Sequence, residues 1–379
     1  MGNSKIYLSS PHMGGEELGF INQAFETNWL SPLGPNVDGF EKDLESYSGA
    51  KHAAALSSGT AAIHLALIIL GIKRGDEVLV SSFTFSGSVN PIAYVGATPI
   101  MIDSEKETWN LSPEFLEEAI EDRKKKVGKV PKALVLVHLY GMPAKLSEVK
   151  RICAKHNIAI IEDAAEALGS SYQNQKLGTF GDIGIYSFNG NKIITTSGGG
   201  ALISHNKNWV EKARFLATQA RDNAPHYQHS EIGYNYRMSN VVAGMGRGQM
   251  LVLDDWVSKR RSINGWYKEV LGGLEGIEFL TEPNSDYYSN YWLTTILIDE
   301  NKMSLSRNQI MKLFAEANIE TRPLWKPMHL QPVFACFPFY GNGFSNGLFE
   351  NGLCLPSGSN LTGNEKERIE KVLQEVVKS

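Results

Sequence analysis

A lysine near the middle of the chain is the first candidate for chemistry. Lys192 follows the apolar run 183–188 and the small-residue turn NGN. A lysine held by a tight turn can reach into a pocket, where its amine is available as a nucleophile. Glycines at 198–200 allow close backbone approach before the next apolar strand, 201–204, which predicts a packed pocket wall. The alternative is a solvated surface lysine, the commoner situation for this residue type.

A second candidate is a turn of small residues between an apolar strand and an apolar helix. The run 53–56 predicts a buried strand, and SSGT leads into the helix that follows. Free N–H groups and the positive end of the helix dipole at Ser58, Gly59 and Thr60 would bind an anion, and a phosphate would suit them. Simple N-capping by serine is the alternative.

A carboxylate and an aromatic side chain also follow predicted strands. Asp163 comes after the strand 158–161, where an ionised carboxylate could accept a hydrogen bond from a protonated ring nitrogen. It could equally cap a helix over AAEAL, with Glu166 as the third residue of a capping box, and both functions can hold together. Phe83 and Phe85 follow the strand 77–81; either ring could cover a flat ligand or pack in the core.

Near the C-terminus, the loop RPLWKPMHLQP gathers polar and aromatic side chains among prolines. Arg322, Trp325, Lys326 and His329 on such a rigid loop could hold a polar or phosphorylated ligand. An ordinary surface loop is the alternative.

The elements that must position these groups alternate between strands and helices. Predicted strands are 53–56, 77–81, 98–102, 133–137, 158–161, 183–188 and 201–204, with predicted helices 16–27, 37–47, 112–120 and 146–156 and one after Ser58. This alternation indicates an α/β sheet covered by helices on both faces. Ligands of open α/β sheets bind beyond the carboxyl ends of the strands. The Ser58 turn, Phe85, Asp163 and Lys192 are therefore expected at one edge.

A long helical region from Val241 predicts a link between two domains. We expect a large domain over residues 1–253 and a smaller α+β domain over 254–379, with a strand at 292–298, a helix at 306–317, a strand at 352–355 and a terminal helix from Asn364. At 379 residues and 42% hydrophobic content, the chain can bury a large core.

Charge and cysteine content exclude several classes of function. The net charge of −4 and the isoelectric point near 6.2 supply no basic field for nucleic acid or an anionic membrane. Cys153, Cys336 and Cys354 lack metal-ligand spacing, which argues against zinc and disulfides. No P-loop motif occurs, and GMGRGQ lies in a predicted helix without dinucleotide-binding spacing. No signal peptide or membrane span is visible, so we expect a soluble cytoplasmic protein.

The ordered motifs SSGT, FTF, EDAAEALG, YSFNGNK and GYNYRMSN resemble the pyridoxal-phosphate sugar aminotransferases of the DegT/DnrJ/EryC1/StrS family along nearly the whole chain. The resemblance implies a type I fold like that of aspartate aminotransferase. Such a fold has a large domain with a mixed, mostly parallel, seven-stranded sheet and a smaller α+β C-terminal domain. It also implies pyridoxal 5′-phosphate, with a pyridoxamine phosphate form, as the cofactor.

The resemblance also implies roles for individual residues. Lys192 would bond to the cofactor aldehyde, Asp163 would contact the ring nitrogen and Phe85 would stack on the ring, with Glu166 beside the ring hydroxyl where many relatives carry His or Gln. The phosphate would be bound by Ser58, Gly59, Thr60 and Ser187, and by Asn235 of a neighbouring subunit in a homodimer with shared sites. Sugar-nucleotide contacts would come from Asn28, Trp29, Leu30, Ser31, Arg322, Pro323, Leu324, Trp325 and His329.

Within the family, phrases such as PHMGGEEL, NGNKIITTSGGG, ETRPLWKPMH and CLPSGS most resemble the members of the bacillosamine route in glycan biosynthesis. These convert the C4 ketone of UDP-2-acetamido-2,6-dideoxy-hexos-4-ulose to an amine, with glutamate as the donor and 2-oxoglutarate as its product. Alternatives are amination of another nucleotide-linked keto sugar, as in pseudaminic acid, perosamine or 3-amino sugar routes, or a non-catalytic sensor that binds the cofactor. The sugar dehydrases of the family replace the lysine, so Lys192 argues against them.

Overall fold

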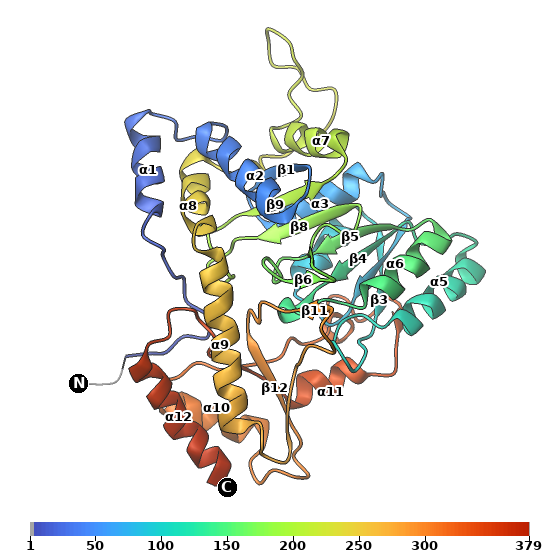
Figure 1. Cartoon of the computed structure of the whole chain (residues 1–379). Coiled ribbons are helices and arrows are strands. Elements are labelled where there is room, and N and C mark those ends of the chain that lie inside the picture. Colours follow the sequence, from blue (N-terminus) through green and yellow to red (C-terminus); the bar gives the residue numbers. More distant parts are fainter. Residues whose placement is uncertain (1–3, 379) are drawn as a thin grey trace.

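The computed structural model describes residues 4–378. Its main sheet has eight strands in the order β1-β9-β8-β5-β4-β2-β3-β14 (Figure 1). The strands are β1 (His52–Leu56), β2 (Glu77–Ser81), β3 (Thr98–Ile102), β4 (Ala133–Val137), β5 (Ala159–Asp163), β8 (Ile183–Ser187), β9 (Gly200–Ser204) and β14 (Phe339–Tyr340). All pair in parallel except at β9, which is antiparallel to both β1 and β8.

Helices cover both faces of this sheet, as the alternating pattern predicted (Figure 1). One face packs against α2 (Pro35–Ser48), α5 (Pro113–Val127), α6 (Leu146–His156) and α8 (Asn240–Met250), and the other against α3 (Gly59–Ile69), α4 (Asn90–Tyr94) and α7 (Lys207–Ala217). Strand β1 divides accordingly, with Ala53 and Ala55 in one apolar core and Ala54 and Leu56 in the other. Such two-sided burial explains why the strands read as continuous apolar runs.

One strand more than the expected seven belongs to the main sheet. Strand β14 comes from the C-terminal part of the chain and pairs in parallel with β3, Phe339 opposite Met101. Its two residues lie between Pro338 and Gly341 without the alternation of a longer strand, so no sequence pattern indicates it.

The second sheet is antiparallel, in the order β10-β12-β15-β13. It consists of β10 (Ile277–Phe279), β12 (Thr294–Ile298), β15 (Gly352–Leu355) and β13 (Arg322–Pro323), and it shares a core with α9 (Leu253–Leu271), α10 (Arg307–Glu316) and α12 (Gly363–Lys378). Helix α9 runs from the level of the main sheet down to this second sheet (Figure 1). Further elements are α1 (Glu17–Glu26), α11 (Phe344–Asn351) and a small sheet of β6 (Ser171–Tyr172), β7 (Gln175–Lys176) and β11 (Tyr287–Tyr288), besides three single-turn 3-10 helices in the described part of the chain.

The long helical region predicted from Val241 is two helices, since α8 ends at Met250 and α9 begins at Leu253. The division into residues 1–253 and 254–379 stays a proposal. Between residues 4 and 378, no helix is both long and apolar enough to span a bilayer.

Candidate active site

The predicted site residues meet at a cavity of about 350 Å³ beyond the carboxyl ends of the parallel strands. Eight of the nine residues predicted to hold a cofactor line it: Ser58, Gly59, Thr60, Phe85, Asp163, Glu166, Ser187 and Lys192. They come from the ends of β1, β2, β5 and β8 and the loops that follow. The convergence follows from parallel strands whose carboxyl ends share one edge.

Lys192 lies on the turn after β8, and its side chain is mostly buried, at 12% exposure. The turn is closed by a hydrogen bond from the Lys192 N–H to the Asn189 carbonyl at 3.0 Å. The amine Nζ lies 3.4 Å from Glu166 Oε1 and 4.1 Å from the centre of the Trp292 ring. The alternative of a solvated surface lysine is therefore wrong.

Two buried carboxylates lie on the same wall of the cavity as Lys192. Asp163 accepts hydrogen bonds from Ser88 Oγ at 2.7 Å and from the Ala165 N–H at 3.2 Å, and Glu166 accepts one from the Tyr140 N–H at 2.7 Å. Burial raises the pKa of both carboxyls, and their hydrogen bonds and the nearby Lys192 offset only part of that effect. A cationic group in the cavity would therefore be stabilised by them.

The helix over 164–168 that was the alternative for this segment does not form, and the residues after Asp163 make turns instead. The capping-box alternative for Asp163 and Glu166 is thus wrong. Asp163 instead accepts from the N–H two residues on, the Asx-turn geometry that competes with a helix.

The Ser58 turn ends in the N-terminus of α3. Ser58 Oγ accepts a hydrogen bond from the Ala61 N–H at 3.0 Å, so the predicted N-cap is present. The cap satisfies one of the free N–H groups of the first turn and leaves the end of the helix dipole at the cavity. A side chain at Gly200 would collide with the Ser58 backbone, so glycine there permits the close packing of β9 against this turn.

The two phenylalanines after β2 have separate environments. Phe83 is buried in the core at 2% exposure, whereas Phe85 is 53% exposed and lines the cavity. The Phe85 ring centre lies 5.4 Å from that of Trp325. The core alternative therefore holds for Phe83 only.

Three further residues at the site were missed by sequence reasoning. Ser88 orients Asp163, the Trp292 ring lies under the Lys192 amine, and the Tyr140 hydroxyl accepts a hydrogen bond from the Trp325 N–H at 2.9 Å. Ser88 belongs to the same loop as Phe85, which was the available signal. Nothing local marks Trp292 or Tyr140, since the hydrogen bonds of the Trp292 indole and the Tyr140 hydroxyl join them to residues at least 100 positions away in the chain.

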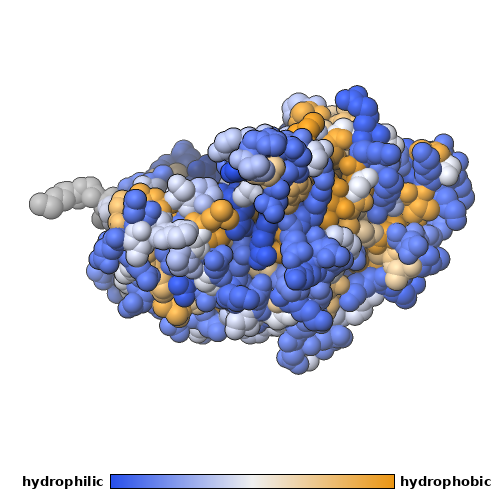
Figure 2. Space-filling view, turned by 90° about the horizontal axis from the view of Figure 1, so that it is seen from above, coloured by the Kyte–Doolittle hydropathy of each residue, from blue (hydrophilic) through white to orange (hydrophobic). Residues whose placement is uncertain are grey.

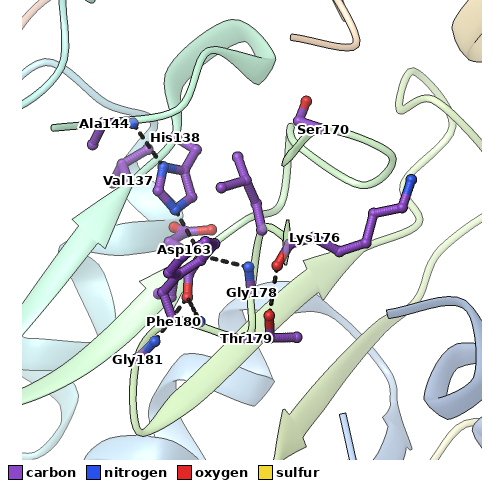
Figure 3. A network of polar contacts seen from close by, with 12 residues as sticks. Val137, His138, Ala144, Asp163, Ser170, Lys176, Gly178, Thr179, Phe180 and Gly181 are labelled. Carbon is purple, nitrogen blue, oxygen red and sulfur yellow. Dashed lines mark hydrogen bonds and ion pairs between the residues drawn. The ribbon is translucent and has the colours of Figure 1, made fainter. Parts of the chain in front are cut away.

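A buried His–Glu pair lies behind the Asp163 strand end (Figure 3). The Ala144 N–H donates to His138 Nδ1 at 3.1 Å, so Nε2 carries the ring hydrogen and donates to Glu162 Oε1 at 2.9 Å. Glu162 also accepts from the N–H groups of Gly178, Phe180 and Gly181. This network joins the ends of β4 and β5 to the loop that enters β8.

A second cavity of about 700 Å³ adjoins the first, and Asn191, Trp292 and Trp325 line both. The predicted sugar-contact residues Arg322, Pro323, Leu324 and Trp325 all line this second cavity. Arg322 is paired with Glu320 through two hydrogen bonds at 2.9 and 2.6 Å.

The other predicted residues lie outside the linings of both cavities. His329 is held by Ser82 Oγ at 2.7 Å and stacks on Phe339 at 3.7 Å. The segment Asn28–Ser31 is an exposed loop after α1, and Asn235 is exposed beside Thr218. The chain brings none of these to its own cavity.

Comparison with known proteins identifies the kind of enzyme to which this cavity belongs. A model of the DegT/DnrJ/EryC1/StrS aminotransferase family matches residues 11–375. The chain belongs to the DegT/DnrJ/EryC1/StrS aminotransferase family. The match covers both sheets and every residue that lines the first cavity.

Among the relatives in this family, the putative pyridoxal phosphate-dependent aminotransferase EpsN of Bacillus subtilis is 52% identical to this chain, and the alignment covers 98% of this chain and 95% of the relative. GDP-perosamine synthase of Caulobacter vibrioides is 35% identical over 98% of each. The crystal structure of a DegT DnrJ EryC1 StrS aminotransferase from Brucella abortus has a TM-score of 0.89 at 27% identity, covering 96% of both chains. The predicted α/β aminotransferase fold is thus confirmed.

Pyridoxal phosphate is the cofactor of this DegT/DnrJ/EryC1/StrS aminotransferase family, so the predicted cofactor is confirmed. The cavity fits it chemically. A helix N-terminus at one end suits a phosphate, and a buried carboxylate suits a protonated ring nitrogen. An amine lies within reach for an aldehyde, and an exposed aromatic ring borders the space.

Proposed function

We propose that the protein aminates the C4 ketone of a UDP-linked 2-acetamido-2,6-dideoxy-4-keto-hexose, with glutamate as the amino donor. The donor becomes 2-oxoglutarate, and the ketone oxygen is replaced by the amine. The observation that carries the proposal is the meeting of Lys192, Asp163 and the α3 N-terminus in one cavity. The bacillosamine-type sequence phrases favour the UDP-linked acetamido sugar over other nucleotide sugars.

In this proposal each side chain has a defined task. Bound pyridoxal phosphate supplies a carbonyl group that takes up the amino group and a ring that withdraws electrons. Lys192 Nζ would hold the cofactor at that carbonyl and would serve as the base that moves the proton at the reacting carbon. Asp163, oriented by Ser88, keeps the ring nitrogen protonated. Ser58, Gly59, Thr60 and Ser187 bind the phosphate, while Phe85 covers the ring.

The second cavity supports a binding surface for the sugar nucleotide. It opens beside Trp325, which also borders the first cavity, and it is lined by Tyr7, Trp292 and the segment Arg322–Trp325. Aromatic side chains suit the apolar face of a sugar or base, and Arg322 suits a phosphate once it leaves Glu320. Roles for Glu166 beside the ring hydroxyl and for His329 in sugar binding stay predictions.

We also propose a homodimer with shared sites. Asn235 and the loop Asn28–Ser31 are exposed and lie outside the cavity of their own chain, as residues that complete a neighbour's site would. Exposed apolar side chains occur nearby on α1 and the loop after it, and on the long excursion that projects between α7 and α8 (Figure 1): Leu18, Phe25, Trp29, Leu33, Tyr227 and Ile232. Apolar patches interrupt the mostly hydrophilic face on this side of the molecule (Figure 2).

Subunit mixing tests the shared site. Lys192→Ala and Asn235→Ala chains should each be poorly active alone. Hybrid dimers combine one intact lysine with Asn235 of the partner subunit, so the mixture should regain activity at one site in each hybrid. A mixture that stays as inactive as its components, while sedimentation shows dimers, contradicts the proposal.

A panel of nucleotide-linked keto sugars tests the reaction. The protein, loaded with cofactor, is incubated with glutamate and each sugar, and product structure is read by NMR for the configuration at C4. We expect turnover of the UDP-linked acetamido sugar and loss of that turnover in Lys192→Ala. Preference for a GDP-linked keto sugar would instead support perosamine-type chemistry, which the 35% identity to GDP-perosamine synthases favours as the second candidate. If the absorption spectrum of the bound cofactor does not change on addition of glutamate, the result supports the alternative of a non-catalytic sensor that only binds the cofactor.

A further inference from the structure

The peptide carbonyl that precedes Lys192 lies in a closed ring of hydrogen bonds. The Asn191 carbonyl accepts from Ser9 Oγ at 2.8 Å and from Trp292 Nε1 at 2.7 Å. Those two residues are joined in turn by Arg260, which donates to Ser9 Oγ at 3.0 Å and to the Trp292 carbonyl at 2.6 Å. Four segments far apart in the sequence therefore meet around one carbonyl group.

Arg260 is the unusual member of this ring. It lies on α9 at 1% exposure, and among the ion pairs of residues 4–378 none involves it. Its remaining contact is with the Ser357 carbonyl at 3.1 Å. A buried guanidinium compensated only by carbonyl and hydroxyl dipoles costs free energy, and burial lowers the pKa of Arg260 to about 9, so the group still carries its charge at neutral pH.

The ring fixes both the base and the surroundings of the Lys192 side chain. The Asn191 carbonyl, held from two sides, fixes the peptide from which Lys192 extends. The indole that makes one of those hydrogen bonds is also the ring that lies 4.1 Å from Nζ. A charged donor at one end of a hydrogen-bonded chain polarises the following members, which stiffens the whole set.

We propose that Arg260, acting through Ser9 and Trp292, is a positioning residue that holds the Lys192 amine in the cavity. This inference rests on the proposed role of Lys192. The N-terminal segment, through Ser9, and α9, through Arg260, would thus position the catalytic amine although neither lines the first cavity.

The test measures how fast Lys192 is acetylated by acetic anhydride in the full-length chain without added cofactor. Peptide mass spectrometry follows every lysine separately across a range of pH. Ser9→Ala removes one hydroxyl from the ring, Arg260→Met removes the charge, and Ser9→Thr keeps a hydroxyl. Matched controls are Ser147→Ala, which removes a serine hydrogen bond to Tyr172, and Arg261→Met, which removes the neighbouring guanidinium on α9.

We expect acetic anhydride to acetylate Lys192 about fivefold faster in Ser9→Ala and in Arg260→Met than in the unaltered chain. This change in rate matches the loss of roughly one hydrogen bond. Half-buried Lys176 should react as before, and Ser9→Thr and both controls should behave like the unaltered chain. Unchanged reactivity of Lys192 in Ser9→Ala overturns the proposal, even if Arg260→Met fails to fold. An equal increase in the acetylation rates of Lys192 and Lys176 also overturns the proposal, because that result indicates a general loosening of the fold. Since no sugar or donor is used, failure here is distinct from failure of the proposed reaction.

Discussion

Asp163 is a buried carboxylate whose environment disfavours its charge. Burial raises its pKa above the ordinary 3.8, so the folded chain without cofactor binds that proton more tightly than the unfolded chain. The carboxyl therefore contributes stability that is fully present below pH 3.8 and is lost as the pH rises through the folded-state pKa. The ionised carboxylate that the proposed function needs at neutral pH is therefore expected to lower the stability of the folded chain without cofactor.

The variant Asp163→Asn separates these two effects. Without cofactor it should be more stable than the unaltered chain at neutral pH, and the difference should vanish toward pH 3.8. Its aminotransfer rate should fall by about a hundredfold or more, because the ring nitrogen loses its charged partner. Urea unfolding at several pH values and steady-state rates give the two readings. If Asp163→Asn is less stable than the unaltered chain at neutral pH, the raised pKa of Asp163 is contradicted.

At the same scale, the sequence predicted the residues whose position follows from the strand they end. Asp163, Ser58, Phe85 and Lys192 each follow an apolar run, and parallel strands carry such residues to one edge. Ser88 could be found from its loop, but Trp292 could not. Its place beside Lys192 depends on the Asn191 carbonyl, 101 residues earlier in the chain.

At the scale of elements, hydrogen bonds to Glu162, the residue before Asp163, tie the end of β5 to its neighbouring segments. Glu162 accepts four hydrogen bonds from His138 and from the loop before β8 (Figure 3). Burial alone raises the pKa of Glu162, but the hydrogen bonds from His138, Gly178 and Gly181 outweigh it and hold the pKa below the ordinary 4.5. The ionised carboxylate thus ties the entry of β8, and so the lysine turn, to β5.

Glu162→Gln should lower the free energy of unfolding by about 2 kcal/mol at neutral pH, since an amide nitrogen would face donors that need an acceptor. The pKa is depressed, so this contribution is present above pH 4.5 and lost as the pH falls through the lower folded-state value. The gap between variant and unaltered chain should therefore narrow in acid. Exposed Glu118→Gln is the control, and a gap independent of pH would show that the carboxylate charge is not involved.

The elements themselves were predicted well where periodicity was long. Seven of the eight strands of the main sheet, all but β14, and helices such as α6 and α10 lie within one to two residues of their expected ranges. The pattern failed over 164–168, where alanine and leucine favour a helix but Asp163 bonds locally to Ala165 and Glu166 turns back to Tyr140. Propensity there is overridden by tertiary hydrogen bonds.

At the scale of the whole molecule, the C-terminal part is tied to the main sheet through Asp103. This fully buried carboxylate follows β3 and accepts from the N–H groups of Gly343, Phe344 and Ser345 at the start of α11. Strand β14 pairs with β3 beside it. Sequence pattern cannot find such a link, because it joins residues 240 positions apart.

Asp103→Ala should loosen this link and lower the free energy of unfolding by about 3 kcal/mol, through the loss of hydrogen bonds to a charged group. Hydrogen exchange should accelerate at residues 339–345, at the β3 amide of Met101 and at the amide of position 103 just after β3, which donate to the Pro338 and Tyr340 carbonyls. Asp286→Ala, an exposed aspartate bonded to Gln173, is the control. Unchanged exchange at 339–345 would mean that β14 alone holds the segment.

The three cysteines have one practical consequence. Cys153 and Cys354 are buried, and burial raises the pKa of the Cys153 thiol to about 12 and that of Cys354 above its usual range. Cys336 is exposed, on the segment between the Trp325 loop and β14. Because thiolates react and buried thiols do not, a maleimide fluorophore would attach at Cys336 alone. The natural chain thus carries a single accessible thiol on the segment that joins the proposed sugar-binding loop to β14, and a fluorophore can be attached there without any engineered change.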